Sequence, residues 1–205
     1  MPVIEVVWRH LLVGARDGHR RWPSVSALAG ELGIPVSTAH RSLGHPVEIG
    51  AVSIGTLDGL QVLDPVRLLV LFAAHRRAKR DIVNRFRVEI PAGEVECLAT
   101  SREVTLGGFG AIVAHMHGVN RIADYNTVLF YGDPRLPKLP TARGGEGTEV
   151  LVAEPDRLLS SYGRVTPFCQ AYADLFSLPG WQAARFVEEL DMQKVAVSDE
   201  PLLLV

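Results

Sequence analysis

The apolar residues near the start of the chain follow the repeat of an amphipathic helix. Between residues 3 and 15 they recur three or four positions apart, which places them on one helical face. They are Val3, Ile4, Val7, Leu11 and Leu12. The pattern predicts a first helix over residues 3–15, and the polar, basic stretch Arg16–Arg21 predicts a loop after it.

A second periodic stretch, residues 23–43, predicts two short helices joined by a tight turn. The first helix has three apolar residues on one face: Val25, Leu28 and Leu32. Ser24 stands where a hydroxyl can cap the helix start. Gly33 stands where a left-handed residue commonly ends a helix. Together these positions predict a helix over residues 25–32 and a turn at Gly33.

The second of these helices is predicted to begin around Pro35 and to bury Ala39 and Leu43. Its outward side chains would be Ser37, Thr38, His40 and Arg41. Small hydrogen-bonding side chains and a cation suit a helix that lies in a DNA major groove. A plain pair of surface helices is the alternative interpretation.

Two short β-prone runs follow, around residues 52–54 and 60–63, with Thr56-Leu57-Asp58-Gly59 between them. An Asp-Gly pair between such runs is a hairpin signal. The order helix, helix-turn-helix and hairpin is that of a winged helix-turn-helix, and four independent local signals agree on it. The N-terminal part is therefore predicted to bind DNA.

Asp64 and Pro65 predict the start of another helix, which we expect to run from Val66 to about Val83. Its first half is apolar, whereas its second half carries cations at Arg76, Arg77, Lys79 and Arg80. Cations near a helix C-terminus are favoured by the helix dipole alone. They also suit contacts with DNA phosphates, as do Arg20 and Arg21 in the preceding loop.

Strand and helix patterns alternate in the rest of the chain, which predicts a mixed α/β domain. Strands are expected at residues 85–90, 126–132 and 148–155, and a helix at 109–117. Two helices are expected near the end of the chain, and residues 195–205 could add a tail strand. The first of these helices is expected to have one apolar face. Its members are Phe168, Tyr172, Leu175 and Phe176.

Composition agrees with an ordinary globular protein, at 47% hydrophobic and 21% charged residues in 205. The two cysteines, Cys97 and Cys169, form no metal motif and no disulfide framework, so a reducing cytoplasm is expected. No apolar run approaches the roughly 20 residues that span a bilayer. Residues up to Arg87 carry a net charge of +5 and the remainder −7. This asymmetry suggests two domains, of which the first attracts polyanions.

Candidate chemistry is sparse. Gly107-Gly108 could admit a phosphate at a helix N-terminus, but close packing of helix on strand is the stronger interpretation. His115 and His117 lie two residues apart, on different helical faces, so no metal site is expected. No nucleophile-elbow pattern or Walker-type phosphate loop occurs. No catalytic, cofactor or metal residue is therefore assigned.

The C-terminal half resembles the AbiEi-type antitoxins of abortive-infection toxin–antitoxin systems. The likeness covers TLGGFGAIVAHMHG, NTVLFYGD, VLVAEPDRLL and, above all, the closing stretch from Thr166 to Leu190. The residues that match in that stretch are Pro167, Gln170, Tyr172, Asp174, Leu175, Gly180, Ala183 and Ala184. The resemblance implies a DNA-binding N-terminal domain, autoregulation of an operon, and a C-terminal domain with a degenerate nucleotidyltransferase fold.

Active nucleotidyltransferases place two carboxylates one residue apart to hold a metal ion against a nucleotide triphosphate. Here Asp124 is followed two positions later by Asn126, whose neutral amide cannot replace the missing charge. We therefore expect no nucleotidyltransferase activity and no cofactor.

The sequence thus predicts an α+β protein with a winged helix-turn-helix DNA-binding domain over residues 1–84. A mixed α/β domain resembling a degenerate nucleotidyltransferase fold, for protein contacts or signal sensing, is predicted over residues 85–205. The expected function is that of a cytoplasmic repressor that binds a double-stranded DNA operator, as a homodimer or at adjacent sites, with a cognate toxin as a possible protein partner and no membrane. The DNA-contacting residues are expected to be Ser37, Thr38, His40, Arg41, Arg20, Arg21, Thr56, Arg76, Arg77, Lys79 and Arg80. A minimal nucleotidyltransferase, and a module that neutralises a toxin without binding DNA, are the alternatives.

Overall fold

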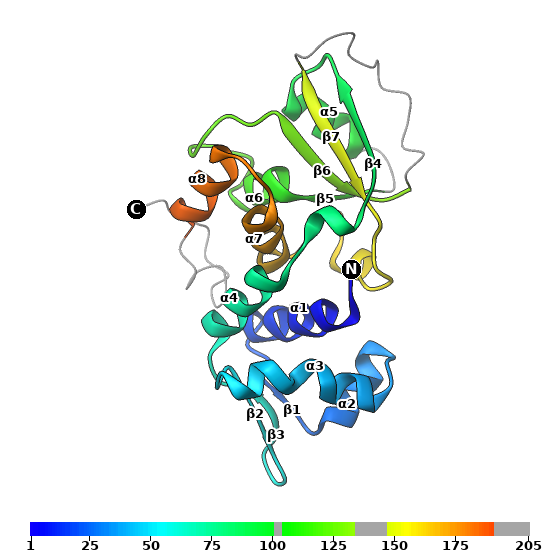
Figure 1. The fold of residues 1–205 in the computed structure, drawn as a ribbon, viewed down its shortest axis with the longest axis vertical. Coiled ribbons are helices and arrows are strands. Elements are labelled where there is room, and N and C mark those ends of the chain that lie inside the picture. Colours follow the sequence, from blue (N-terminus) through cyan, green and yellow to red (C-terminus); the bar gives the residue numbers. More distant parts are fainter. Residues whose placement is uncertain (101–103, 134–146, 191–205) are drawn as a thin grey trace. The chain divides into compact units, whose positions relative to one another are not determined.

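The computed structural model describes residues 1–100, 104–133 and 147–190, so residues 191–205 of the expected second domain lie outside the described part. The chain is a mixed α+β protein that divides into two compact units, residues 2–76 and 77–190 (Figure 1). Each unit contains one β-sheet. Within the described ranges, no helix is long and apolar enough to cross a bilayer.

Unit 2–76 contains four helices and a small sheet. Its elements are α1 (Val3–Arg16), β1 (Arg21–Trp22), α2 (Val25–Leu32), α3 (Val36–Glu48), β2 (Val52–Gly55), β3 (Gly59–Val62) and α4 (Pro65–His75). The strands form an antiparallel sheet in the order β1-β3-β2. The largest apolar side chains of its core are Trp8, Trp22 and Phe72, all at most 1% exposed.

Three of the predicted helix ends in this unit are confirmed. Ser24 begins α2, and its Oγ accepts a hydrogen bond of 3.0 Å from the backbone N–H of Ala27. Gly33 ends that helix with φ of +56°, the left-handed geometry that glycine adopts without steric cost. Asp64 begins α4 by accepting from the backbone N–H of Arg67.

Helix α3 is longer than predicted, because it continues through Pro46 to Glu48. Proline has no N–H, so the carbonyl of Ser42, four residues earlier, loses its usual helical donor. The indole N–H of Trp8 supplies a donor instead, at 2.6 Å from that buried carbonyl. A side chain from α1 thus satisfies the backbone group that Pro46 leaves unpaired, and the helix continues.

The hairpin of β2 and β3 confirms the prediction made from Asp58-Gly59. Gly59 has φ of +67°, and a Cβ there would collide with the backbone carbonyls of Trp22 and Pro23. Glycine is therefore required both by the turn and by the close approach of β1 to β3.

The helix predicted over residues 66–83 is wrong in its second half, because α4 ends at His75. Arg76 is extended, with φ of −56° and ψ of 135°, and its guanidinium is fully buried 2.9 Å from the carboxylate of Glu5 on α1. Arg76 therefore turns toward the core of its own unit. The predicted boundary at residue 84 falls inside a strand, and the units divide at residues 76 and 77 instead.

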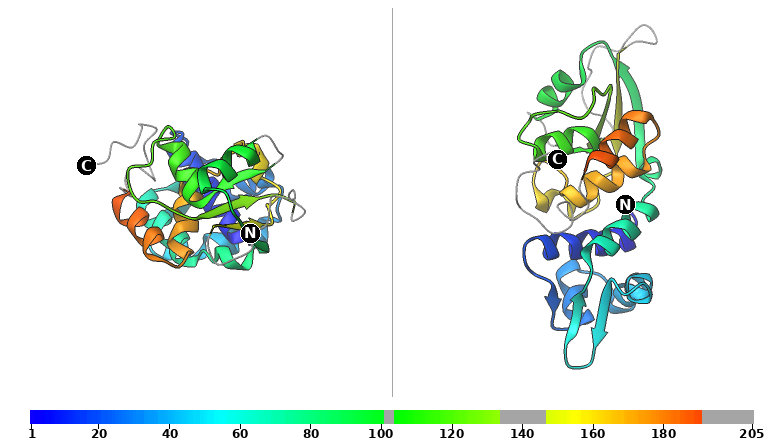
Figure 2. Two further views of the ribbon diagram at one scale, coloured as in Figure 1. Left: turned by 90° about the horizontal axis from the view of Figure 1, so that it is seen from above. Right: turned by 90° about the vertical axis from the view of Figure 1, so that its left-hand side faces the viewer.

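Unit 77–190 contains a four-stranded sheet with helices packed against it (Figure 2). Its elements are η1 (Ala78–Arg80), β4 (Ile82–Val88), α5 (Ala92–Thr100), β5 (Thr105–Gly107), α6 (Gly108–His115), β6 (Thr127–Tyr131), β7 (Thr148–Ala153), η2 (Leu159–Tyr162), α7 (Phe168–Ser177) and α8 (Trp181–Glu189). The strand order is β4-β7-β6-β5; β6 and β7 are parallel, and the other two pairs are antiparallel.

The two faces of this sheet bury different clusters, as the alternation of side chains along a strand requires. Val128, Phe130, Val150 and Val152 pack with residues of α5 on one face. Leu129, Tyr131, Leu151 and Ala153 pack with Leu159 on the other. The sheet is therefore covered on both sides.

Three sequence expectations for this unit need correction. Strand β4 begins at Ile82 instead of residue 85, because its pairing with β7 starts there. Helix α5 was not expected; it begins directly after Pro91, a position where proline is tolerated. Phe176 is 51% exposed and does not share the buried face of α7.

We expect Trp8→Phe to destabilise unit 2–76 by about 1–3 kcal/mol, because it leaves the buried Ser42 carbonyl without a donor. Pro46→Ala restores a backbone N–H to that carbonyl, so Trp8→Phe should cost about 1–2 kcal/mol less in the Pro46→Ala background. Denaturant unfolding of the four proteins of this double-mutant cycle measures the coupling.

Trp22→Phe combined with Pro46→Ala is the matched control. Trp22 is an equally buried indole, but it donates to Glu31 at 2.9 Å and should show no coupling to Pro46. Additive effects of Trp8→Phe and Pro46→Ala, within about 0.5 kcal/mol, would contradict the role assigned to the Trp8 indole.

Candidate functional site

The exposed face of α3 contains the side chains that the sequence placed outward. Ala39 and Leu43 are fully buried, whereas Ser37, His40 and Arg41 are exposed and Thr38 is half-buried. Nη2 of Arg41 lies 3.4 Å from Oγ1 of Thr38, one helical turn away. The face therefore presents short hydroxyls, an imidazole and one guanidinium to solvent.

The longer α3 extends this face by one turn beyond the predicted residues. His45 stands four residues after Arg41, on the same side of the helix, and is exposed. Its Nδ1 lies 3.3 Å from the carboxylate of Glu48. The sequence analysis did not include His45, because the predicted helix-turn-helix stretch ends at Leu43.

The β2–β3 hairpin projects its turn into solvent. Thr56 and Asp58 are exposed at the turn, and Leu57 between them is 98% exposed. Arg21 lies on the neighbouring strand β1, opposite Gln61 of β3, and is exposed, while Arg20 before it is half-buried. The structure thus gathers Arg20, Arg21, Thr56 and the α3 residues into one unit.

The cations predicted from residues 76–80 do not form one patch. Arg76 is buried against Glu5, so it is unavailable to a phosphate; this site assignment is corrected. Arg77, Lys79 and Arg80 are exposed, but they belong to the other compact unit, at η1. A single basic stretch in the sequence is thus divided between the core of one unit and the surface of the next.

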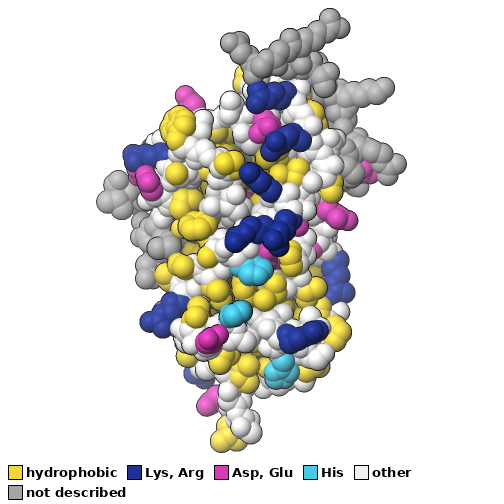
Figure 3. Space-filling view, viewed as in Figure 1, with side chains coloured by type: hydrophobic (Ala, Val, Ile, Leu, Met, Phe, Trp, Pro, Cys, Tyr) yellow, Lys and Arg dark blue, Asp and Glu magenta, His cyan; other side chains and the backbone are white. Residues whose placement is uncertain are grey.

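Because of this division, unit 2–76 carries little of the positive charge found in the first 87 residues. Unit 2–76 contains seven arginines and six acidic residues, a net charge of +1. Most of the +5 excess therefore comes from residues 77–87, which lie in the other unit. On the face shown in Figure 3, the Lys and Arg side chains near the hairpin end are scattered among acidic, apolar and His side chains.

The glycine pair of unit 77–190 packs tightly, as the sequence favoured. A Cβ on Gly107 would lie 2.8 Å from the Tyr131 ring of β6, and Gly108 has φ of +53° at the start of α6. Nε2 of His115 lies 2.9 Å from the carbonyl oxygen of Thr166, whereas His117 is exposed. In the described ranges, no three His, Cys, Asp or Glu side chains lie together as a possible metal site.

The stretch Asp124-Tyr125-Asn126 precedes β6, with Asp124 and Asn126 exposed. Tyr125 stands between these two residues. Its hydroxyl donates to the carboxylate of Glu96 and lies 3.0 and 3.1 Å from the two carboxylate oxygens. Burial raises the pKa of Glu96 to about 7, although the Tyr125 hydrogen bond opposes the shift. Burial, with Glu96 nearby, also raises the pKa of Tyr125.

Glu96 could not be found from the sequence, because it lies on α5, a helix that the sequence did not predict. Its partner Tyr125 is 29 residues away and stacks on Phe109 of α6 with ring centroids 4.9 Å apart. Three separate segments therefore build this half-buried carboxylate site, and no local pattern marks it.

Comparisons of the chain with protein-family models, with curated proteins and with solved structures gave no match.

We expect the stability of unit 77–190 to fall by up to about 3 kcal/mol as the pH rises from about 5 to 8. In the folded state the pKa of Glu96 is about 7, against an ordinary value of 4.5. The stability contributed by this protonated carboxyl group is therefore fully present below pH 4.5, and it is lost as the pH rises through 7. Denaturant unfolding at several pH values measures it.

Glu96→Gln is the matched control, because its amide oxygen can still accept from Tyr125 and it does not titrate. The variant should be less sensitive to pH than the wild type across this window. Equal pH dependence in the two proteins would show that Glu96 does not carry the effect.

Proposed function

We propose that unit 2–76 is a winged helix-turn-helix that binds double-stranded DNA and that the protein is a transcriptional regulator. In this proposal α3 lies in the major groove and the β2–β3 hairpin is the wing. The observation that supports it most is the exposed face of α3, which carries Ser37, His40 and Arg41 beside a solvent-exposed hairpin turn. Such side chains can read base edges, whereas the hairpin can follow the backbone.

The charge of this unit limits how it would bind. Affinity for DNA comes largely from phosphate neutralisation, and the unit has a net charge of only +1. The proposal places Arg20 and Arg21 at phosphates and Arg41 at a base edge. Because one such module has a small footprint, we infer that two copies bind one operator, as a homodimer or at adjacent sites.

The resemblance to AbiEi-type antitoxins suggests which gene the protein would regulate. It implies that the operator lies upstream of the protein's own operon and that a neighbouring gene encodes a toxin. Under this proposal the protein represses by occupying the promoter, and unit 77–190 is a nucleotidyltransferase-like domain without the transferase reaction. A neighbouring gene for a toxin nucleotidyltransferase would support the assignment, and a gel shift with the upstream region tests the binding itself.

Arg41→Ala should weaken binding to the specific operator by about 1–3 kcal/mol if Arg41 contacts a base. The gel shift measures this loss against Arg121→Ala, an exposed cation before β6 that removes the same charge from the other unit. Equal affinities of the wild type and Arg41→Ala would exclude Arg41 from the interface. Absence of any shift with the upstream region would favour the alternative, a module that contacts a toxin only.

The salt dependence of binding should be shallow, because two cations, Arg20 and Arg21, neutralise phosphates in each bound copy. A slope of log K against log salt of about −0.9 per phosphate contact gives about −1.8 per copy. Replacing Arg77, Lys79 and Arg80 together by Gln should leave this slope unchanged. A slope near −4.5 that falls to about −1.8 in the triple variant would instead place those three cations on the DNA.

A further inference from the structure

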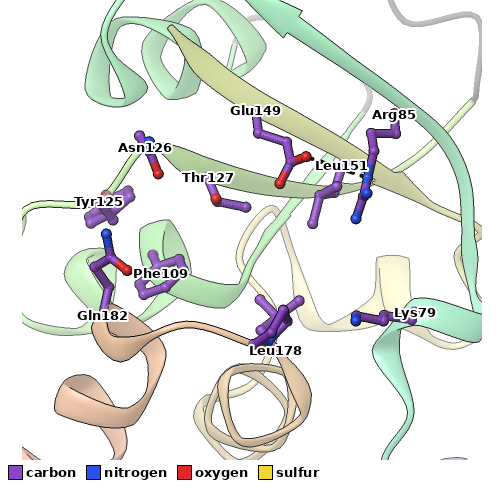
Figure 4. Close-up of a pocket in the computed structure, with 11 residues that line it drawn as sticks. Lys79, Arg85, Phe109, Tyr125, Asn126, Thr127, Glu149, Leu151, Leu178 and Gln182 are labelled. Carbon is purple, nitrogen blue, oxygen red and sulfur yellow. Dashed lines mark ion pairs between the residues drawn. The ribbon is translucent and has the colours of Figure 1, made fainter. Parts of the chain in front are cut away.

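Unit 77–190 has a small, partly open pocket beside the sheet face that carries Leu129 and Leu151 (Figure 4). Residues from η1, three strands or their ends, α6 and α8 line it, so the fold assembles it from positions up to about a hundred residues apart. It lies entirely within this unit and is separate from the proposed DNA-binding face.

The pocket lies where this sheet face changes from apolar to polar residues, toward the start of β6 and β7. Farther along the two parallel strands the face is apolar, with Leu129 opposite Leu151. At the starts of the strands the paired residues are Thr127 and Glu149, which are only half-buried. The backbone N–H of Glu149 donates to the carbonyl of Asn126 at 2.7 Å, so this polar rim is held by main-chain bonding.

One end of the pocket is cationic. Figure 4 shows Lys79 and Arg85 reaching toward this end from η1 and β4, with Glu149 beside them. Nε of Arg85 lies 3.5 Å from the Glu149 carboxylate. Within the described part of the chain, the ammonium of Lys79 has no hydrogen-bond or ion-pair partner. Two cations against one carboxylate leave a net positive charge, which favours an anionic group.

The opposite end is aromatic and held in place. Tyr125 and Phe109 stack with an interplanar angle of 11°, and Phe186 meets Phe109 edge-on with ring centroids 5.1 Å apart. The hydroxyl of Tyr125 is occupied by Glu96. This wall is therefore a fixed apolar surface against which a flat group can pack.

Hydrogen-bonding side chains lie between the two ends. Asn126, Thr127 and Gln182 line the pocket (Figure 4). Their side chains make no hydrogen bond with any described residue. These amide and hydroxyl groups converge on a concave, partly apolar site and are not hydrogen-bonded to one another. Such groups can orient a small polar ligand.

We propose that this pocket binds a small organic anion, in which a carboxylate or phosphate is joined to a planar group that can hydrogen bond. The acidic group lies at Lys79 and Arg85, and the planar group lies along Tyr125 and Phe109 with its polar edge toward Asn126 and Gln182. Carboxylate and phosphate share the charge and the acceptor oxygens that the cationic end recognises. This site would make unit 77–190 a ligand sensor.

Isothermal titration calorimetry of the full chain tests the proposal with two probe classes, nucleoside 5′-monophosphates (AMP and UMP) and aryl carboxylates (benzoate and indole-3-acetate). Adenosine and indole are the uncharged counterparts. We expect at least one anionic class to bind, and its uncharged counterpart to bind about tenfold more weakly or not at all. Binding of AMP or UMP alone identifies a phosphate ligand, and binding of the aryl acids alone identifies a carboxylate ligand.

Lys79→Gln and Arg80→Gln form a matched pair, because both remove an exposed cation from η1 and only Lys79 lines the pocket. Lys79→Gln should weaken binding about tenfold and Arg80→Gln should leave it nearly unchanged. Equal losses in the two variants would show unspecific attraction to the basic surface and overturn the site. Failure of both probe classes to bind the wild type at about 10 mM would also overturn it. Neither outcome bears on DNA binding, which the gel shift reports separately.

Discussion

The helical part of unit 2–76 depends on the hydrogen bond from the Trp8 indole to the Ser42 carbonyl. The indole is fully buried, and its N–H donates to the Ser42 carbonyl that Pro46 leaves without a helical partner. An unpaired buried carbonyl is costly, so this one bond allows α3 to continue to Glu48. The exposed residues of α3 therefore stand on a helix whose position is set by a side chain of α1.

A second buried contact decides the electrostatics of the same unit. Glu5 is 1% exposed and pairs with Arg76 at 2.9 Å and with His75 at 3.1 Å. A buried carboxylate needs such partners, and supplying them ends α4 and removes a cation from the surface. The unit is consequently close to neutral. A DNA-binding function for it would rest on direct contacts of α3 and on a second copy more than on long-range attraction.

In unit 77–190 the corresponding constraint is aromatic. Phe109, Tyr125 and Phe186 pack against one another, and the carboxylate of Glu96 accepts a hydrogen bond from the Tyr125 hydroxyl. Gly110 leaves room for the Glu96 carboxylate, since a Cβ there would collide with it. One end of the proposed ligand pocket is therefore rigid. The cationic end, built from Lys79 and Arg85, is exposed and can adjust to an acidic group.

The sequence by itself determined most of the local elements of unit 2–76, because their signals lie within a few residues of one another. Apolar spacing gave α1 and α2, Ser24 and Gly33 gave the ends of α2, and Asp58-Gly59 gave the hairpin. The outward residues of α3 followed from the same spacing. In unit 77–190, strands β6 and β7 were evident as continuous apolar runs.

Tertiary structure decided what depends on partners distant in sequence. Trp8 carries α3 past Pro46, and Glu5 draws Arg76 inward and ends α4. The division of the basic stretch between two units follows from that turn and from the pairing of β4 with β7. Helix α5, the raised pKa of Glu96 and the pocket at Lys79 and Arg85 likewise arise from segments brought together only by folding. Local periodicity cannot encode them, because burial and charge pairing depend on which segments meet.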